Sequence, residues 1–123
     1  MSSRSRPVSL PGLFAALADT TRLRLLNLMA GREVCVCYFV EVLRQSQPKI
    51  SRHLAYLRKA GIVAARREGK WMHYSICPLA DQTAGSILAA VLAALGHDKR
   101  MTADLARLDR ACRGEELHQI EKG

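Results

Sequence analysis

The sequence predicts a mainly α-helical domain that carries one β-hairpin, and three observations support this fold class. Apolar residues recur at helical spacing through most of the chain. Two β-rich runs, 62–66 and 71–76, are joined through Glu68-Gly69-Lys70, a glycine-containing loop of hairpin length. Aromatic residues make up only 5% of the 123 residues, and glycine and proline are few. We therefore expect helices to form most of the core.

Six helices are expected, with a short extended or irregular piece at 33–37 between the second and the third. They are predicted over 9–17, from Asp19 or Thr20 to Met29, over 39–43, over 46–60, from Pro78 to about Leu95, and over 98–113. Two short helices joined by a few residues and followed by a hairpin form a winged helix-turn-helix. We divide the chain into a flexible N-terminal arm (1–8), a winged helix-turn-helix domain with its dimerisation helix (9–97), and a C-terminal helix and tail (98–123).

The fourth helix has one apolar and one polar face. Ser46 can cap its first turn, and Ile50, Leu54 and Leu57 form an apolar stripe that must face a core. The other face and the N-terminal end carry charged, amide and hydroxyl side chains, namely Gln47, Lys49, Ser51, Arg52, His53 and Tyr56. Such a helix suits the major groove of DNA, where Gln can pair with adenine and Arg with guanine. The plainer interpretation is a solvated charged surface, which is common on helices.

The hairpin extends the positive charge of the fourth helix. Residues 44–74 contain eight basic residues against a single acid, Glu68, in a chain whose net charge is +8. We expect Arg66, Arg67 and Lys70 to lie near the DNA backbone or the minor groove, where they position the protein without reading bases. Double-stranded DNA is therefore the predicted partner.

The segment Ile87–Leu95 is apolar on every side. A helix without a polar face must be covered all round, and one small subunit has few elements to cover it. The favoured solution is an isologous homodimer in which this helix packs against its symmetry mate and the first helix, and the alternative is burial within one subunit. A dimer presents two recognition helices one duplex turn apart, about 34 Å, and so selects an operator with an inverted repeat.

The cellular compartment follows from the apolar runs. The longest of them is far shorter than a membrane span, and Met1–Pro11 has no apolar run behind its basic residues. We therefore expect no membrane partner and a cytoplasmic protein, whose four cysteines are reduced thiols.

Two of the cysteines, Cys35 and Cys37, are separated by one residue just before the third helix. In an extended chain such side chains point to the same side, whereas on a regular helix they diverge by about 200°. The pair can therefore bind one soft ion only if the backbone is not a regular helix, and that ion would bend or unwind the start of the third helix. Alternatively, both are small buried hydrophobic residues. Cys77 is expected to pack, and Cys112, at the end of an apolar stripe, is either a packing residue or the best candidate for a third ligand.

Three stretches together, Glu33–Cys37, Gln45–Leu54 and Gly69–Tyr74, closely resemble the arsenical-resistance repressors of the ArsR/SmtB family. The similarity covers about residues 10–95. It implies a homodimeric winged-helix repressor that leaves the operator of a resistance operon when arsenite or antimonite, As(III) or Sb(III), binds. Carried over by motif, Cys35 and Cys37 are the inducer ligands, and Gln47, Lys49, Ser51, Arg52 and His53 lie on the DNA-reading helix.

One departure from the family pattern affects the ligand set, because Val40 stands where the pattern has a third cysteine. Trivalent arsenic prefers three thiolates, so the third must come from Cys112, from Cys77, from a small thiol, or not at all. A methylated arsenical that needs two sulfurs is therefore an alternative inducer, and thiol oxidation is an alternative signal. The zinc ligands of the zinc-sensing branch are not matched, since Asp81 has no histidine two residues on.

A thiol enzyme, such as an arsenate reductase, is the remaining functional class. Its chemistry needs an activated thiolate beside an oxyanion cradle or a general acid. Arg32 and Glu33 lie near Cys35 in the sequence, but there is no glycine-rich anion loop. We therefore predict a regulator and not an enzyme.

Overall fold

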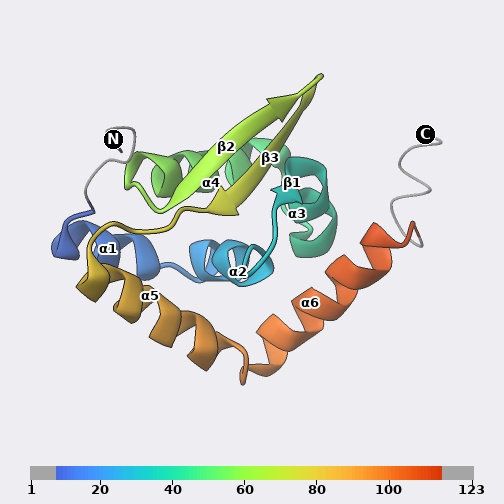
Figure 1. Ribbon diagram of the computed structural model, residues 1–123. Helices are drawn as coiled ribbons and strands as arrows, with labels where there is room; N and C mark the ends of the chain where they lie inside the picture. Colours follow the sequence, from blue (N-terminus) through green and yellow to red (C-terminus); the bar gives the residue numbers. More distant parts are fainter. Residues whose placement is uncertain (1–7, 115–123) are drawn as a thin grey trace.

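The computed structural model describes residues 8–114, which form six helices and three strands (Figure 1). In chain order these are α1 (Leu10–Leu17), α2 (Thr20–Leu28), β1 (Val34–Cys35), α3 (Val36–Leu43), α4 (Gln47–Lys59), β2 (Val63–Glu68), β3 (Trp71–Ile76), α5 (Gln82–Leu95) and α6 (Lys99–Cys112). This order confirms the predicted mainly helical fold with a β-hairpin wing. Residues 1–7 of the predicted arm and 115–123 of the predicted tail lie outside the described residues, whereas Val8 packs against the core.

Polar side chains fix where the helices begin. The Ser46 hydroxyl accepts a hydrogen bond of 3.3 Å from the backbone N–H of Lys49, as expected for the cap of α4. The start of α5 differs from the prediction, because Pro78 lies in the connection after β3 and Asp81 caps the helix by accepting from the N–H of Thr83. The Pro78 side chain has no acceptor for the free N–H groups of a first turn. The prediction that Pro78 opens this helix is therefore wrong.

The three strands form one antiparallel sheet in the order β1-β3-β2. β2 and β3 pair along their full length, so that only Gly69 and Lys70 remain in the loop of the hairpin. Gly69 has a φ of +64°, which residues with a side chain rarely adopt. The hairpin projects away from the helices (Figure 1), and β1 pairs with the other edge of β3, where Cys35 lies opposite His73. The extended piece predicted over 33–37 is therefore confirmed only for 34–35, which form the third strand of the sheet, whereas 36 and 37 already belong to α3.

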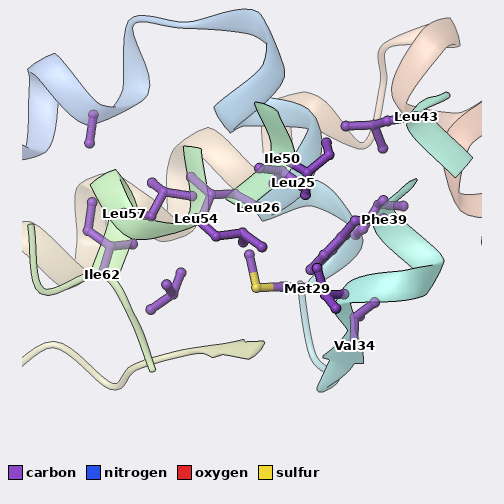
Figure 2. Close-up of a cluster of buried hydrophobic side chains, with 14 of the residues drawn as sticks. Leu25, Leu26, Met29, Val34, Phe39, Leu43, Ile50, Leu54, Leu57 and Ile62 are labelled. Carbon is purple, nitrogen blue, oxygen red and sulfur yellow. The ribbon is translucent and has the colours of Figure 1, made fainter. Parts of the chain in front are cut away.

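The core lies between α2, α3 and α4. The predicted stripe of α4, Ile50, Leu54 and Leu57, has no exposed surface at all, which confirms its inward orientation. Figure 2 shows these side chains pointing toward those of α2 and α3, together with residues that flank the sheet. The labelled partners are Leu25, Leu26, Met29, Val34, Phe39, Leu43 and Ile62. Because its back is buried in this way, α4 presents a fixed outer face.

The last helix, α6, is attached to α2 by a buried ion pair. Nε and Nη2 of Arg24 donate to the two carboxylate oxygens of Asp104 at 2.8 and 2.9 Å, and both side chains are more than nine-tenths buried. The amide of Asn27 also donates to the backbone carbonyl of Met101 at 3.0 Å. α6 thus packs on α2 and α3 of its own chain. The sequence predicted its apolar edge, but it gave no indication of these polar contacts.

α5 is apolar but largely uncovered within the described chain. Only Ala84 and Leu88 are buried, whereas several alanines near its C-terminal end are exposed. On α1, Phe14 and Leu10 are 54% and 39% exposed. The alternative that one subunit buries this helix is therefore wrong for residues 8–114. No helix among these residues is long and apolar enough to cross a membrane.

The buried ion pair leads to a stability prediction. Asp104→Ala leaves the guanidinium of Arg24 buried without a counter-charge, and we expect it to lower the free energy of unfolding by about 3–5 kcal/mol. Asp109→Ala is the matched control on the same helix, because its ion pair with Arg32 is exposed at 39% and 51% and is worth less than about 1 kcal/mol. Urea unfolding at a fixed protein concentration measures both. Equal, small losses in the two variants would contradict a structural role for the buried pair.

Candidate nucleic-acid interface and thiol site

The turn between α3 and α4 sets the direction of the predicted recognition helix. Arg44 ends α3 in the left-handed conformation, with φ of +57°, which is uncommon for a residue other than glycine. The amide of the next residue, Gln45, donates to the hydroxyl of Thr21 on α2 at 3.4 Å. This contact ties the turn to the helical body. Beyond it, the side chains of Ser46, Gln47, Lys49 and Arg52 are exposed at the start of α4.

Two predicted DNA-facing residues of α4 also contact α2 or its N-terminal cap. His53 is 19% exposed, and its Nδ1 lies 3.8 Å from Oδ1 of Asp19. The guanidinium of Arg22 lies 4.0 Å from the centre of the Tyr56 ring, and it also donates to the backbone carbonyl of Ala16 at 2.8 Å. The structure thus places His53 and Tyr56 at the junction of two helices, and Ser51 is only partly exposed. Helical spacing gave the face of α4 correctly but could not reveal which neighbours reach its edge.

The wing carries Arg66, Arg67 and Lys70, all of them exposed. Arg66 makes a bidentate ion pair with Glu33, at 2.7 and 3.0 Å, and a further contact of 3.2 Å with Glu68. The Arg66 guanidinium holds the pKa of the Glu33 carboxyl below its usual range. Sequence reasoning missed this role of Glu33, because the two residues meet only when β1 pairs with β3. The wing is therefore connected directly to the segment that precedes Cys35.

The two neighbouring cysteines lie side by side where β1 becomes α3. Cys35 has extended backbone angles, φ −73° and ψ 144°, and is the residue before the first turn of α3, whereas Cys37 lies within that turn. Their sulfur atoms are 3.3 Å apart. The geometric condition derived from the sequence, that the backbone at this pair is not a regular helix, is therefore confirmed. Two thiols at this distance can bind one soft, thiophilic atom.

Burial keeps one of these thiols protonated. Desolvation, followed by the contact with Cys35, raises the pKa of the Cys37 thiol to about 12. A thiol of this kind is a poor nucleophile at neutral pH, because the thiolate is the reactive form. The site therefore has the donor atoms of a soft-ligand site, and burial disfavours the thiolate form of Cys37.

The remaining cysteines lie in different places. Cys112 is exposed at the end of α6, and it lines a cavity of about 420 Å³ together with Cys35, Tyr38 and His73. Cys77 lines a separate cavity between α4 and the hairpin. Within residues 8–114, no three His, Cys, Asp or Glu side chains are close enough to form a ready metal site. The interpretation of Cys112 as a packing residue is wrong, since its side chain is not buried in the apolar edge of α6.

Comparisons with known proteins agree with this architecture. The family described as bacterial regulatory protein, arsR family, matches residues 19–65. The arsenic resistance transcriptional regulator ArsR1 of Pseudomonas putida is 43% identical over 99 residues, which cover 80% of this chain and 76% of that protein. The arsenical resistance operon repressor of Escherichia coli is 52% identical over 67 residues, which cover 54% of this chain and 57% of that repressor.

Solved structures also resemble this chain. HlyU from Vibrio cholerae superposes with a TM-score of 0.58 at 28% identity, covering 65% of this chain and 84% of that one. The transcriptional repressor BigR from Xylella fastidiosa has the same TM-score at 26% identity, and the match covers 69% of this chain and 84% of that one. The fold, the helix-turn-helix with its wing and the extent of the likeness to ArsR1 lead to one conclusion. The chain belongs to the arsR family of bacterial regulatory proteins.

Proposed function

We propose that this protein is a cytoplasmic, homodimeric repressor that binds an operator inverted repeat and is released when arsenite or antimonite binds Cys35 and Cys37. The observation that carries the proposal is the 3.3 Å separation of the two sulfur atoms at the point where β1 becomes α3. Two of the matched relatives are named for arsenic or arsenical resistance. Soft thiol donors favour trivalent arsenic and antimony over hard cations such as Mg²⁺.

The DNA-binding part of the proposal rests on exposed cationic and amide groups. Gln47, Lys49 and Arg52 at the start of α4 suit the edges of bases in the major groove. Arg67 and Lys70 on the wing suit the adjacent phosphates. His53 and Tyr56 support this surface from its edge through their contacts with α2. In this arrangement the core holds α4 from behind, and the charged face meets the duplex.

The dimer is supported by the uncovered apolar surface of α5 and α1. α5 has exposed alanines along the side that its own chain leaves open, and Phe14 of α1 is more than half exposed. A soluble monomer rarely leaves such a surface in water. An isologous contact through α5 buries it and sets two recognition helices apart at a fixed spacing.

The position of the thiol pair gives inducer binding two routes to the DNA surface. The first route is α3, which begins at Val36, directly after Cys35, and packs against α4. The second is the sheet, because Cys35 lies opposite His73 on β3 and Glu33 holds Arg66 on β2. A ligand bound to both sulfurs acts on the end of β1 and on the first turn of α3 at once. The recognition helix and the wing therefore lose their relative positions on the operator.

A thiol-redox sensor is the main competing function, and the burial of Cys37 argues against oxidation that begins at this sulfur. Oxidation proceeds through the thiolate, whereas the Cys37 thiol stays protonated at neutral pH. Trivalent arsenic acids do not need a thiolate at the start, because each thiol condenses with an As–OH group and releases water. A methylarsenite-selective sensor remains the competing function within the same chemistry, since it needs only two sulfurs.

The first prediction concerns the inducer ligands. In the double variant Cys35→Ser/Cys37→Ser, we expect the arsenite concentration for half-release of the operator to rise by more than about 100-fold, because the soft donors are lost. Cys77→Ser is the matched control and should respond as the wild type does. Fluorescence anisotropy of a labelled operator fragment measures the release. Unchanged release in the double variant would rule out these two thiols as the sensor.

The second prediction compares two neighbouring residues of the wing. Arg67→Ala should reduce the salt dependence of operator binding by about one unit of slope, as expected for one lost phosphate contact. Arg66→Ala should change the slope less, because Glu33 already neutralises the Arg66 guanidinium. Operator affinity measured over a series of salt concentrations gives both slopes. A larger loss of slope in Arg66→Ala than in Arg67→Ala would mean that DNA displaces Glu33 and that Arg66 is the main wing contact.

The third prediction concerns the pH dependence of thiol reactivity. Because the pKa of Cys37 is raised to about 12, its alkylation by iodoacetamide should rise about tenfold per pH unit from pH 7 to 9 without levelling off. At pH 7 it should be far slower than alkylation of the exposed Cys112. Peptide mass spectrometry after timed labelling measures both rates. Equally fast labelling of Cys37 at pH 7 would instead favour the redox function.

A further inference from the structure

A cavity of about 420 Å³ lies where β1, α3, β3 and α6 meet. It contains Cys35 of the thiol pair and also Cys112, which is far away in the sequence. His73 on β3 and Tyr38 on α3 complete its sides, and Leu108 of α6 lies beside Cys112. Within residues 8–114, this cavity is therefore the space that the thiol of Cys112 on α6 shares with that of Cys35 at the end of β1.

The position of Cys112 is set by several contacts of α6. Leu108, one helical turn earlier, is fully buried in the core, and Ala111 is 1% exposed. Arg32, in the loop before β1, pairs with Asp109 at 3.2 Å. The buried pair of Arg24 with Asp104 anchors the middle of the same helix. These contacts hold the last turn of α6 against the segment that carries the thiol pair.

We propose that Cys112 is the third thiol of the inducer site, supplied by α6 of the same chain, so that the site binds inorganic trivalent arsenic through three sulfurs. This inference rests on the proposed function and specifies its ligand set. It assigns to Cys112 the place that Val40 leaves without a thiol on α3. Cys77 is not a competitor, because it lines the other cavity, between α4 and the hairpin.

The binding step needs no redox partner. Arsenous acid, As(OH)₃, condenses with three thiols: three As–S bonds form, three As–O bonds break, and three water molecules leave with the thiol protons. Arsenic remains trivalent throughout. A monomethylated arsenous acid has only two hydroxyl groups to exchange, so it forms two As–S bonds and leaves the third thiol unused. The two ligands therefore differ in their need for Cys112.

Within residues 8–114, the three sulfurs are not close enough to one another to form a ready site. Inorganic arsenic must therefore draw the end of α6 and the start of α3 together across the cavity, whereas a methylated arsenical acts on α3 alone. A ligand shifts a conformational equilibrium only through contacts that differ between the two states, and the bond to Cys112 is such a contact. Cys112 thereby couples inducer binding to the packing of α6.

The test compares two inducers and three proteins with a labelled operator, using a phosphine reductant and no added small thiol. We expect Cys112→Ser to raise the arsenite concentration for half-release by more than about tenfold, and to change that for methylarsenite by less than about twofold. Cys77→Ser should have the same half-release concentrations as the wild type for both arsenite and methylarsenite. X-ray absorption of the arsenic should count three sulfur neighbours in the wild type with arsenite and two in Cys112→Ser.

Each result distinguishes this inference from the proposed function. If arsenite releases Cys112→Ser as readily as it releases the wild type, with two sulfur neighbours in both, the assignment of Cys112 is overturned while the sensor function stands. If neither inducer releases the wild type from its operator, the proposed function fails, and the inference fails with it. Urea unfolding of Cys112→Ser should match that of the wild type, because the exposed thiol adds little to the core.

Discussion

The extended backbone at Cys35 is the constraint on which the rest of the arrangement depends. This residue ends β1 opposite His73, and it is also the residue before the first turn of α3. Only an extended conformation satisfies both neighbours, because a helical residue here would break the pairing with β3. The same conformation brings the sulfur of Cys35 to 3.3 Å from that of Cys37. One backbone conformation therefore joins the sheet, the helix-turn-helix and the thiol pair.

α6 contributes to this arrangement through its buried side. Its outer side is polar, but its inner side buries an ion pair with α2 and packs Leu108 into the core. Burying two charges is unfavourable unless the geometry is good, and the bidentate contact of Arg24 with Asp104 provides that geometry. The middle of the helix is consequently anchored through Asp104 and Leu108, and its last turn carries Cys112 to the cavity beside Cys35. A loosely attached helix could not hold a thiol at a defined place there.

Much of the fold could be predicted from local patterns in the sequence. The stripe of Ile50, Leu54 and Leu57 identified the buried side of α4, and Ser46 identified its start. These signals depend on residues within a few positions of one another, so they can be recognised without knowledge of the tertiary structure. The start of α5 differs from the prediction because Asp81, and not Pro78, supplies the side-chain acceptor for its first turn.

The site was less predictable, because its contacts join distant parts of the chain. The cysteine spacing pointed to a soft-ligand pair, yet nothing local indicated that Glu33 would hold Arg66 or that Arg22 would hold Tyr56. Both contacts give a partner to groups that remain exposed on the surface that helical and strand periodicity assigned to DNA. Periodicity gives the direction of a side chain, and only the tertiary structure gives its neighbours.

The proposed role of Cys112 separates two kinds of selectivity along the chain. The segment matched by the family model, residues 19–65, includes α4 and the pair on α3, whereas Cys112 lies on a helix well beyond it. Exchange of α6 between relatives would then change which arsenical is recognised without altering a residue of the DNA-reading helix. Chemical selectivity and operator selectivity can in this way diversify independently, and the last helix becomes the natural place to engineer a biosensor for a chosen arsenic species.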